Sequence, residues 1–269
     1  MPERSPSPRL TARQSLVLRG VVEGYVARAE PIGSQALVES WRLPVSAATV
    51  RNTMAELERF GLIAHPHHSA GRVPTARGYR LYVGALGTAR PLPPGLRAAI
   101  DRGLAGAAGR RDLLRRASAV LARLSHGLAL VWGPQLPPAP GGNGREADRE
   151  LFFAGARELL RQPEFRDGAR ARQVVRLLDE RPRRALFRLA CHDGLRVWMD
   201  GAGMPGLRGL ALVSTAVGCR RIEAALGVLG PLRMPYWRVM PLVASVRGRV
   251  EARAAAAESA SERGEGLVR

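Results

Sequence analysis

The clearest repeat of hydrophobic and polar positions lies between Ser46 and Gly61. Four apolar side chains recur there every three or four residues, which is the spacing of one helix face: Ala47, Val50, Met54 and Leu57. Ser46 is a good N-cap, and Gly61 is well suited to follow the last helical turn. The pattern therefore predicts one amphipathic helix over this stretch.

The other side of this predicted helix carries short polar side chains and one arginine: Thr49, Arg51, Asn52, Thr53 and Glu56. Such side chains near a helix N-terminus can contact base edges in the major groove of DNA. For the helix taken alone, an ordinary solvated face would be the better interpretation. The flanking sequence favours the DNA-binding one.

Ile32–Ser34 opens a pattern that predicts a short helix through Trp41, and Pro44 in the link that follows cannot lie inside a helix. Beyond Gly61, residues 62–65 and 72–74 predict two strands joined by a turn. Helix, turn, helix and hairpin is the order of a winged helix-turn-helix domain. Arg72 on the hairpin would then meet phosphate or the minor groove.

Two more helices complete the predicted DNA-binding domain of residues 10–88. Thr11 caps the first, whose inward candidates are Leu16, Val17, Val21 and Tyr25. Thr75 caps the second, which runs through Val83. Residues 1–9 read as a flexible tail, without the apolar segment of a signal peptide.

Three stretches of this region closely resemble the N-terminal domain of HrcA-type heat-inducible transcription repressors of bacteria: Glu30–Ser34 (EPIGS), Thr49–Asn52 (TVRN) and Ser69–Thr75 (SAGRVPT). Because a generic winged helix would not share the hairpin letters, the resemblance is specific. It implies the following DNA-binding residues: Ser46, Thr49, Arg51, Asn52, Thr53, His68, Ser69, Arg72 and Thr75.

The resemblance also implies a function. It predicts a cytoplasmic homodimeric repressor of the groE and dnaK chaperone operons, which binds a long inverted-repeat operator of the CIRCE type. The chaperonin GroEL would assist its folding into the active form. No enzyme activity, cofactor, metal or membrane partner is expected. The alternative is a winged-helix regulator controlled by a small-molecule ligand in its second domain.

The second half predicts an α+β domain, which the resemblance implies to be GAF-like. Residues 89–150 are expected to be a linker with a helix at 111–125 and a Pro/Gly-rich loop, and residues 253–269 a frayed tail. Between them, the pattern predicts a strand at Leu151–Ala154, a long helix from Glu164 to Leu178, three strands and a closing helix: 195–199, 207–217, 226–231 and the helix opening at 232–236. Val131–Pro134 is interpreted as the end of the linker helix.

The middle of the chain looks shorter than in the family, because few residues separate Pro134 from Leu151 here and family members usually have further strands at this point. The resemblance places dimer contacts in the segment that is missing. Dimerisation is therefore expected through exposed apolar residues elsewhere, giving a weak dimer: Leu207–Val217, Leu226–Leu229, Trp237, Val239 and Leu242.

Charge supports a polyanionic partner without locating it. The formal net charge is +19, and the sequence contains no lysine, so every cationic side chain is arginine. Residues 1–90 hold 12 arginines and 6 acids, whereas the remainder holds 30 and 17. The predicted DNA-binding half is therefore not the more basic half.

Three other motifs have simpler readings. His65, His67 and His68 lack a nearby fourth metal ligand, so a polar hairpin tip is favoured over a zinc site. Cys191–Asp193 contains the letters of a catalytic triad, but sequence neighbours rarely converge as a triad does. Gly201, Gly203 and Gly206 are interrupted by Pro205 and are followed by no clear helix, which argues against a dinucleotide site.

Overall fold

The computed structural model describes residues 8–66, 71–87, 91–134, 149–201, 204–219 and 222–265. The chain divides into two compact units. Unit 1 comprises the residues up to Gly87 together with Leu232–Pro235, and unit 2 comprises the rest. Both contain helices and strands, which confirms the α+β class.

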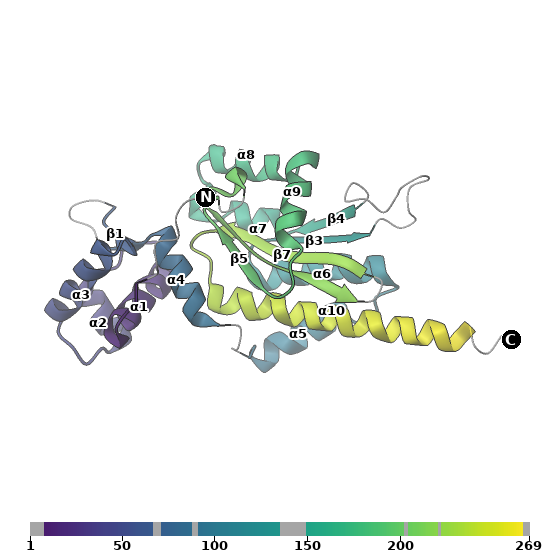
Figure 1. The fold of residues 1–269 in the computed structure, drawn as a ribbon, viewed down its shortest axis with the longest axis horizontal. Helices are drawn as coiled ribbons and strands as arrows, with labels where there is room; N and C mark the ends of the chain where they lie inside the picture. The colour runs from purple at the N-terminus through teal and green to yellow at the C-terminus, as the bar shows by residue number, and fades with distance from the viewer. Residues whose placement is uncertain are drawn as a thin grey trace. The chain divides into compact units, whose positions relative to one another are not determined.

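Unit 1 begins with three helices, α1 (Ala12–Arg28), α2 (Ser34–Trp41) and α3 (Ala47–Arg59). The short strands β1 (Ile63–Ala64) and β2 (Val73–Pro74) and helix α4 (Ala76–Leu86) follow (Figure 1). Strands β1 and β2 pair antiparallel, with Ile63 opposite Pro74. This is the order of elements that the sequence predicts for residues 10–88.

Side-chain caps start three of these helices where the sequence predicts them. Thr11 and Gln14 form a reciprocal capping box on α1, because each side chain bonds the other's backbone N–H. Ser46 Oγ accepts from the Thr49 N–H at 3.2 Å, and Thr75 Oγ1 accepts from the Gly78 N–H at 3.1 Å. Since a cap satisfies an N–H that has no partner within the helix, it fixes where the helix begins.

The core of unit 1 joins the inner faces of α1, α3 and α4, with Val21, Val50, Leu57 and Tyr79 at most 2% exposed. Val17 is buried as predicted, but Leu16 is 39% exposed, so the prediction that it faces inward is wrong. The helical period carries Val17 and Val21 onto the inner face and turns Leu16 away from it.

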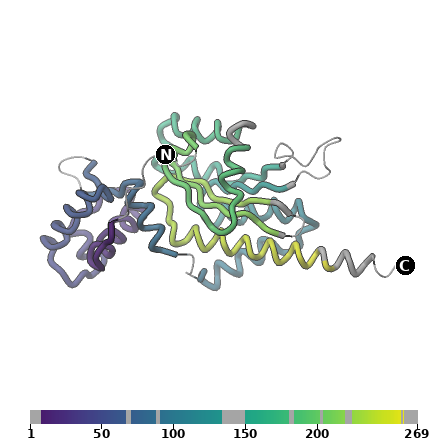
Figure 2. The backbone as a smooth tube through the Cα atoms, in the orientation of Figure 1, coloured from purple at the N-terminus to yellow at the C-terminus, as the bar shows by residue number. Residues whose placement is uncertain are grey.

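Unit 2 is built on a five-stranded antiparallel sheet in the order β4-β3-β7-β6-β5. Its strands are β3 (Leu128–Pro134), β4 (Arg149–Ala154), β5 (Arg196–Met199), β6 (Leu210–Cys219) and β7 (Ile222–Pro231). The long strands β6 and β7 form its central hairpin, paired from Leu210–Pro231 to Cys219–Ile222 (Figure 2). Strands β4 and β5 are the two edges.

Helices cover both faces of this sheet. Helices α7 (Ala156–Leu160), α8 (Gly168–Leu177) and α9 (Glu180–Ala190) cover one face, and α6 (Arg110–Ser125) and α10 (Tyr236–Glu265) cover the other (Figure 1). Helix α5 (Pro94–Leu104) packs on α6 and α10. Side chains alternate between the layers, so Leu128, Leu130 and Trp132 meet α7–α9 while Ala129 and Val131 point the other way.

Several predictions for this half need correction. Residues 128–134 form the strand β3, although Val131–Pro134 was expected to end a helix. The helix expected at 111–125 is present as α6, but α5 and α6 both belong to unit 2, although a linker was expected there. The long helix from Glu164 is instead broken into a short 3₁₀ turn, α8 and α9, with Asp167 and Asp179 at the N-caps. Helix α10 continues to Glu265 in place of the frayed tail.

The prediction of an exposed apolar surface for dimerisation is also wrong. Leu207, Leu226, Leu229, Val239 and Leu242 are at most 1% exposed, because the sheet is covered on both faces. Trp237 is half-buried. These side chains therefore form the core of unit 2 and cannot present an interface without unfolding it.

Candidate nucleic-acid interface

The outward face of α3 is formed by Arg51 and Asn52, which are both exposed. Thr49, one turn from the N-cap, is half-buried. Thr53 is 1% exposed, and its hydroxyl donates to the Thr49 carbonyl at 3.0 Å. The prediction that Thr53 lies on the exposed polar face is therefore wrong, because its Cβ lies beside those of Val50 and Leu57 on the inner face.

The turn between α2 and α3 presents the N-terminal end of α3. Arg42 takes the left-handed conformation, with φ of 47°, and the Leu43 N–H donates to the Val38 carbonyl. Ser46 Oγ and Thr49 Oγ1 lie 3.0 Å apart and share a hydrogen bond. The two hydroxyls predicted to contact DNA thus also hold the start of the helix.

Helix α1 fixes the rotation of α3 through one polar contact. Gln14 Nε2 donates to Glu56 Oε2 at 2.8 Å, across 42 residues of sequence. Glu56 is therefore partly engaged, although it belongs to the predicted polar face. Arg51 and Asn52 remain as the outward pair with functional groups suited to base edges, since a guanidinium and an amide can each make two hydrogen bonds.

The hairpin of β1 and β2 is tied back to the start of α2. Ile32 and Arg72 form an antiparallel bridge, with both backbone hydrogen bonds at 2.9 Å. Gly71 lies so close to this bridge that a Cβ there would be 2.4 Å from the Ile32 carbonyl carbon. Glycine is thus required at residue 71 by this close backbone approach.

Arg72 is engaged within unit 1. Its Nε donates to Glu58 Oε2 at 3.1 Å, its guanidinium contacts His65, and its side chain is only 15% exposed. His65 Nδ1 also lies 2.8 Å from Glu58 Oε1. Arg72 was expected to meet phosphate, and in the structure it links the hairpin to the last turn of α3.

Thr75 likewise has partners within the unit. Besides capping α4, its hydroxyl donates to the Gly61 carbonyl at 2.7 Å and contacts the Leu62 carbonyl. The remaining predicted contacts, His68 and Ser69, lie outside the described residues, as does His67 of the histidine cluster. Among the residues that are described, no group of histidine, cysteine and acidic side chains could hold a metal ion.

On α3 and α4, the sequence reasoning did not single out the exposed arginines other than Arg51. They are Arg59 at the end of α3 and Arg77 and Arg80 on α4. Arg77 reaches toward Gly61, with its Nη1 4.0 Å from where a Cβ would lie. The apolar pattern of α4 could have found Arg77 and Arg80, because Tyr79 and Tyr82 define its inner face and place these two arginines outside it.

The chain is similar to known proteins over both of its halves. A family model described as HrcA protein C terminal domain matches residues 142–240. A heat-inducible transcription repressor HrcA from Kocuria rhizophila is 46% identical over 148 residues, covering 55% of this chain and 42% of the relative. The resemblance to the HrcA family is confirmed.

Other HrcA relatives agree. The repressor from Acidothermus cellulolyticus is 47% identical over 56% of this chain and 43% of its own length. The repressor from Cutibacterium acnes is 42% identical over 62% of this chain and 48% of its own length. The chain thus spans about half the length of the curated relatives it matches. A solved structure described as a hypothetical protein shares the fold, with a TM-score of 0.78 at 18% identity over 91% of this chain and 99% of that one.

No helix in the described part of the chain is long and apolar enough to cross a membrane.

Proposed function

We propose that this chain is a cytoplasmic, sequence-specific DNA-binding repressor of the HrcA type, built of a winged helix-turn-helix domain and a reduced GAF-like α+β domain. The observation that carries the proposal is the outward pair Arg51 and Asn52 on a capped helix that follows a tight turn. Guanidinium and amide groups recognise guanine and adenine edges respectively. The names of the HrcA relatives support the same function.

The operator should be an inverted repeat, and the working form a homodimer. One helix of this size contacts few base pairs, so a single unit discriminates poorly among the sites of a genome. Two copies related by a two-fold axis present two helices to two half-sites. By resemblance, the site is the CIRCE-type repeat before the groE and dnaK chaperone operons.

We further propose that the chaperonin GroEL controls the active fraction of this repressor. Any partner that favours the folded state raises its population by mass action. Heat shock supplies competing unfolded clients, so less chaperonin remains for the repressor and transcription resumes. The relatives are named heat-inducible repressors, which supports a response of this chain to heat.

The test is competition binding of the full-length chain to an inverted-repeat duplex and to a scrambled duplex of equal composition. We expect preference for the repeat by at least about a thousandfold, which is the lower end of the usual range of specific over non-specific DNA binding. Sedimentation at several concentrations, with and without the repeat, checks the dimer. Equal affinity for both duplexes would refute the proposed function.

A second candidate is control by a small molecule bound in unit 2. Trp132 Nε1, Trp198 Nε1 and Ser214 Oγ are buried without a hydrogen-bond partner in the described structure. The strand register places all three on the sheet face that meets α7–α9, and buried polar groups ordinarily have partners. A thermal-shift screen against metabolites tests this, with Ser214→Ala as the control that should weaken any stabilisation observed.

A further inference from the structure

The outer surface of α7–α9 is rich in arginine. Residues 155–190 contain ten arginines and five acidic residues. On α7, its C-cap residue, α8 and α9, five arginines whose side chains are described are exposed and form no side-chain ion pair or hydrogen bond in the described part of the chain: Arg157, Arg161, Arg172, Arg176 and Arg184. We call these five residues the arginine surface.

The spacing within the arginine surface is electrostatically unfavourable. Arg157 and Arg161 are four residues apart on α7 and its C-cap, and Arg172 and Arg176 are four apart on α8. Residues at i and i+4 are neighbours on a helix surface, so like charges there repel each other. No carboxylate within the described residues forms an ion pair with any of these four side chains to offset that repulsion.

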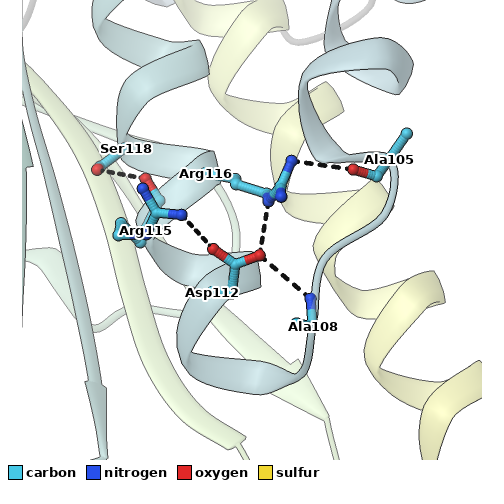
Figure 3. A network of polar contacts seen from close by, with 6 residues as sticks. All are labelled: Ala105, Ala108, Asp112, Arg115, Arg116 and Ser118. Carbon is cyan, nitrogen blue, oxygen red and sulfur yellow. Dashed lines mark hydrogen bonds and ion pairs between the residues drawn. The ribbon is translucent and has the colours of Figure 1, made fainter.

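The opposite layer of unit 2 pairs several of its arginines with carboxylates. Asp112 accepts from Arg116 Nε at 2.7 Å and also contacts Arg115, and the same carboxylate accepts from the Ala108 N–H (Figure 3). Arg247 Nε lies 2.9 Å from Glu251, four residues along α10. Paired charges are therefore available to this fold, and the arginine surface lacks them.

Helix α8 is fixed so that its arginines face solvent. Val174 and Leu177 are buried in the core under α8, and Gln173 Nε2 donates to the Gly206 and Arg208 carbonyls at 2.7 and 2.8 Å. With that side anchored, the helical period turns Arg172 and Arg176 outward. Packing therefore fixes the backbone positions from which these two exposed side chains extend into solvent.

We propose that the arginine surface binds the sugar–phosphate backbone of duplex DNA without regard to sequence. Guanidinium groups hydrogen-bond phosphates in a bidentate manner, and neutralising them relieves the repulsion along each helix. The inference goes beyond the proposed operator contact of α3, because it adds a second, charge-only site on unit 2. It predicts extra affinity for any duplex and no extra discrimination.

Duplex DNA fits this surface better than an acidic protein does. Protein–protein interfaces concentrate apolar and aromatic residues at their centre, whereas protein–DNA interfaces are more polar and much more positively charged. On α8, Val175 is the one large apolar side chain that is exposed, at 61%, and it lies between two arginines.

The test compares two full-length triple variants that lose the same charge. The first is Arg157→Gln, Arg172→Gln and Arg176→Gln. The control is Arg97→Gln, Arg102→Gln and Arg123→Gln, at exposed positions of α5 and α6 on the other side of unit 2. The affinity for a short scrambled duplex is measured as a function of salt concentration. The affinity for polyglutamate is measured in parallel.

We expect the first variant to lower the slope of log K against log salt by about 2 to 3, since each phosphate contact contributes about 0.9. Its affinity for scrambled DNA should fall at least tenfold at low salt, and the control should change the slope by less than about 1. The preference for operator over scrambled DNA should survive, which separates this inference from a failure of α3.

Equal slopes in the two variants, or loss of polyglutamate binding alone, would overturn the proposal. The latter outcome would indicate an acidic protein as the partner. Glutamine is a good helix former, so thermal unfolding should be unchanged. The charge-retaining variant Arg157→Lys, Arg172→Lys and Arg176→Lys provides a second check, because it should keep the wild-type salt slope.

Discussion

Helices α3 and α8 both bury one face and present arginine on the other, but their outer faces differ in chemistry. On α3, Arg51 stands beside Asn52, so donors and an acceptor occur together. On α8, Arg172 and Arg176 present donors only. Discrimination between bases needs a fixed pattern of donors and acceptors, whereas affinity for phosphate needs only charge. Arginine content alone therefore does not distinguish a face suited to base edges from a face suited to phosphate.

The largest expected effect tests whether burial on α3 holds its outer face in place. Leu57 is fully buried, and Leu57→Ala should destabilise unit 1 by about 2–5 kcal/mol through lost contacts and a residual cavity. Val175→Ala on α8, where the side chain is 61% exposed, should change stability by less than about 0.5 kcal/mol. Amide hydrogen exchange of the two helices measures both, and similar losses would remove the distinction.

Next in size is the loss of base contacts. Arg51→Ala and Asn52→Ala should each reduce the preference for operator over scrambled duplex by about 1–3 kcal/mol. Arg59→Ala, at the exposed end of the same helix, is the matched control and should weaken both duplexes alike. Competition gel shifts measure the ratio. An unchanged preference in the Arg51 and Asn52 variants would mean that another surface reads the bases.

A smaller effect is expected at Thr53. Because its side chain is buried and its hydroxyl bonds only within the helix, Thr53→Val should alter stability by less than about 1.5 kcal/mol. The operator preference should be unchanged. A loss of preference with normal stability would restore Thr53 to the reading surface.

The smallest effect concerns the pH dependence of the arginine–carboxylate pairs on α6. The hydrogen bond from Arg116, followed by those from the Ala108 N–H and Arg115, lowers the pKa of Asp112 from 3.8 to about 2. Because the pKa of Asp112 is lower in the folded state, its carboxylate stabilises the fold at pH values above 3.8. This contribution is lost as the pH falls from 3.8 through about 2. Asp112→Asn should flatten the pH dependence of hydrogen exchange in α6 over that window. Arg172→Gln on α8, which has no carboxylate partner, should leave it unaltered.

Local signals were readable from the sequence because local chemistry decides them. Ser46, Thr11 and Thr75 cap helices through hydrogen bonds that span three residues, so the letters suffice. Thr53 was misplaced because its hydroxyl suggested the polar face, whereas its Cβ direction and its bond to the Thr49 carbonyl put it inside. Among the candidate base-contacting residues of α3, Arg51 and Asn52 are those whose exposure the helical periodicity predicted correctly.

The sheet of unit 2 was only partly predictable because its stability comes from distant partners. Strand β3 pairs Leu128 with Leu229, about a hundred residues later, and only His126 and Gly127 separate its apolar residues from those of α6. Burial on both faces removes the alternation that marks an ordinary strand. The engagement of Arg72 with Glu58 was equally hidden, because the two lie 14 residues apart and meet only through the hairpin.

Unit 1 includes the segment Leu232–Pro235, which is synthesised after the strands of unit 2, and this order affects how unit 1 is completed. Arg233 Nη1 donates to the Val26 carbonyl at 2.8 Å, across 207 residues of chain. A ribosome delivers α1 to α4 long before it delivers this arginine, so nascent unit 1 lacks this hydrogen bond until all five strands of the sheet have been translated. Contacts of such long range form late, because the intervening loop must close first. Unit 1 therefore gains its last segment only when synthesis has passed Pro235, and a chain that ends before Leu232 would lack it.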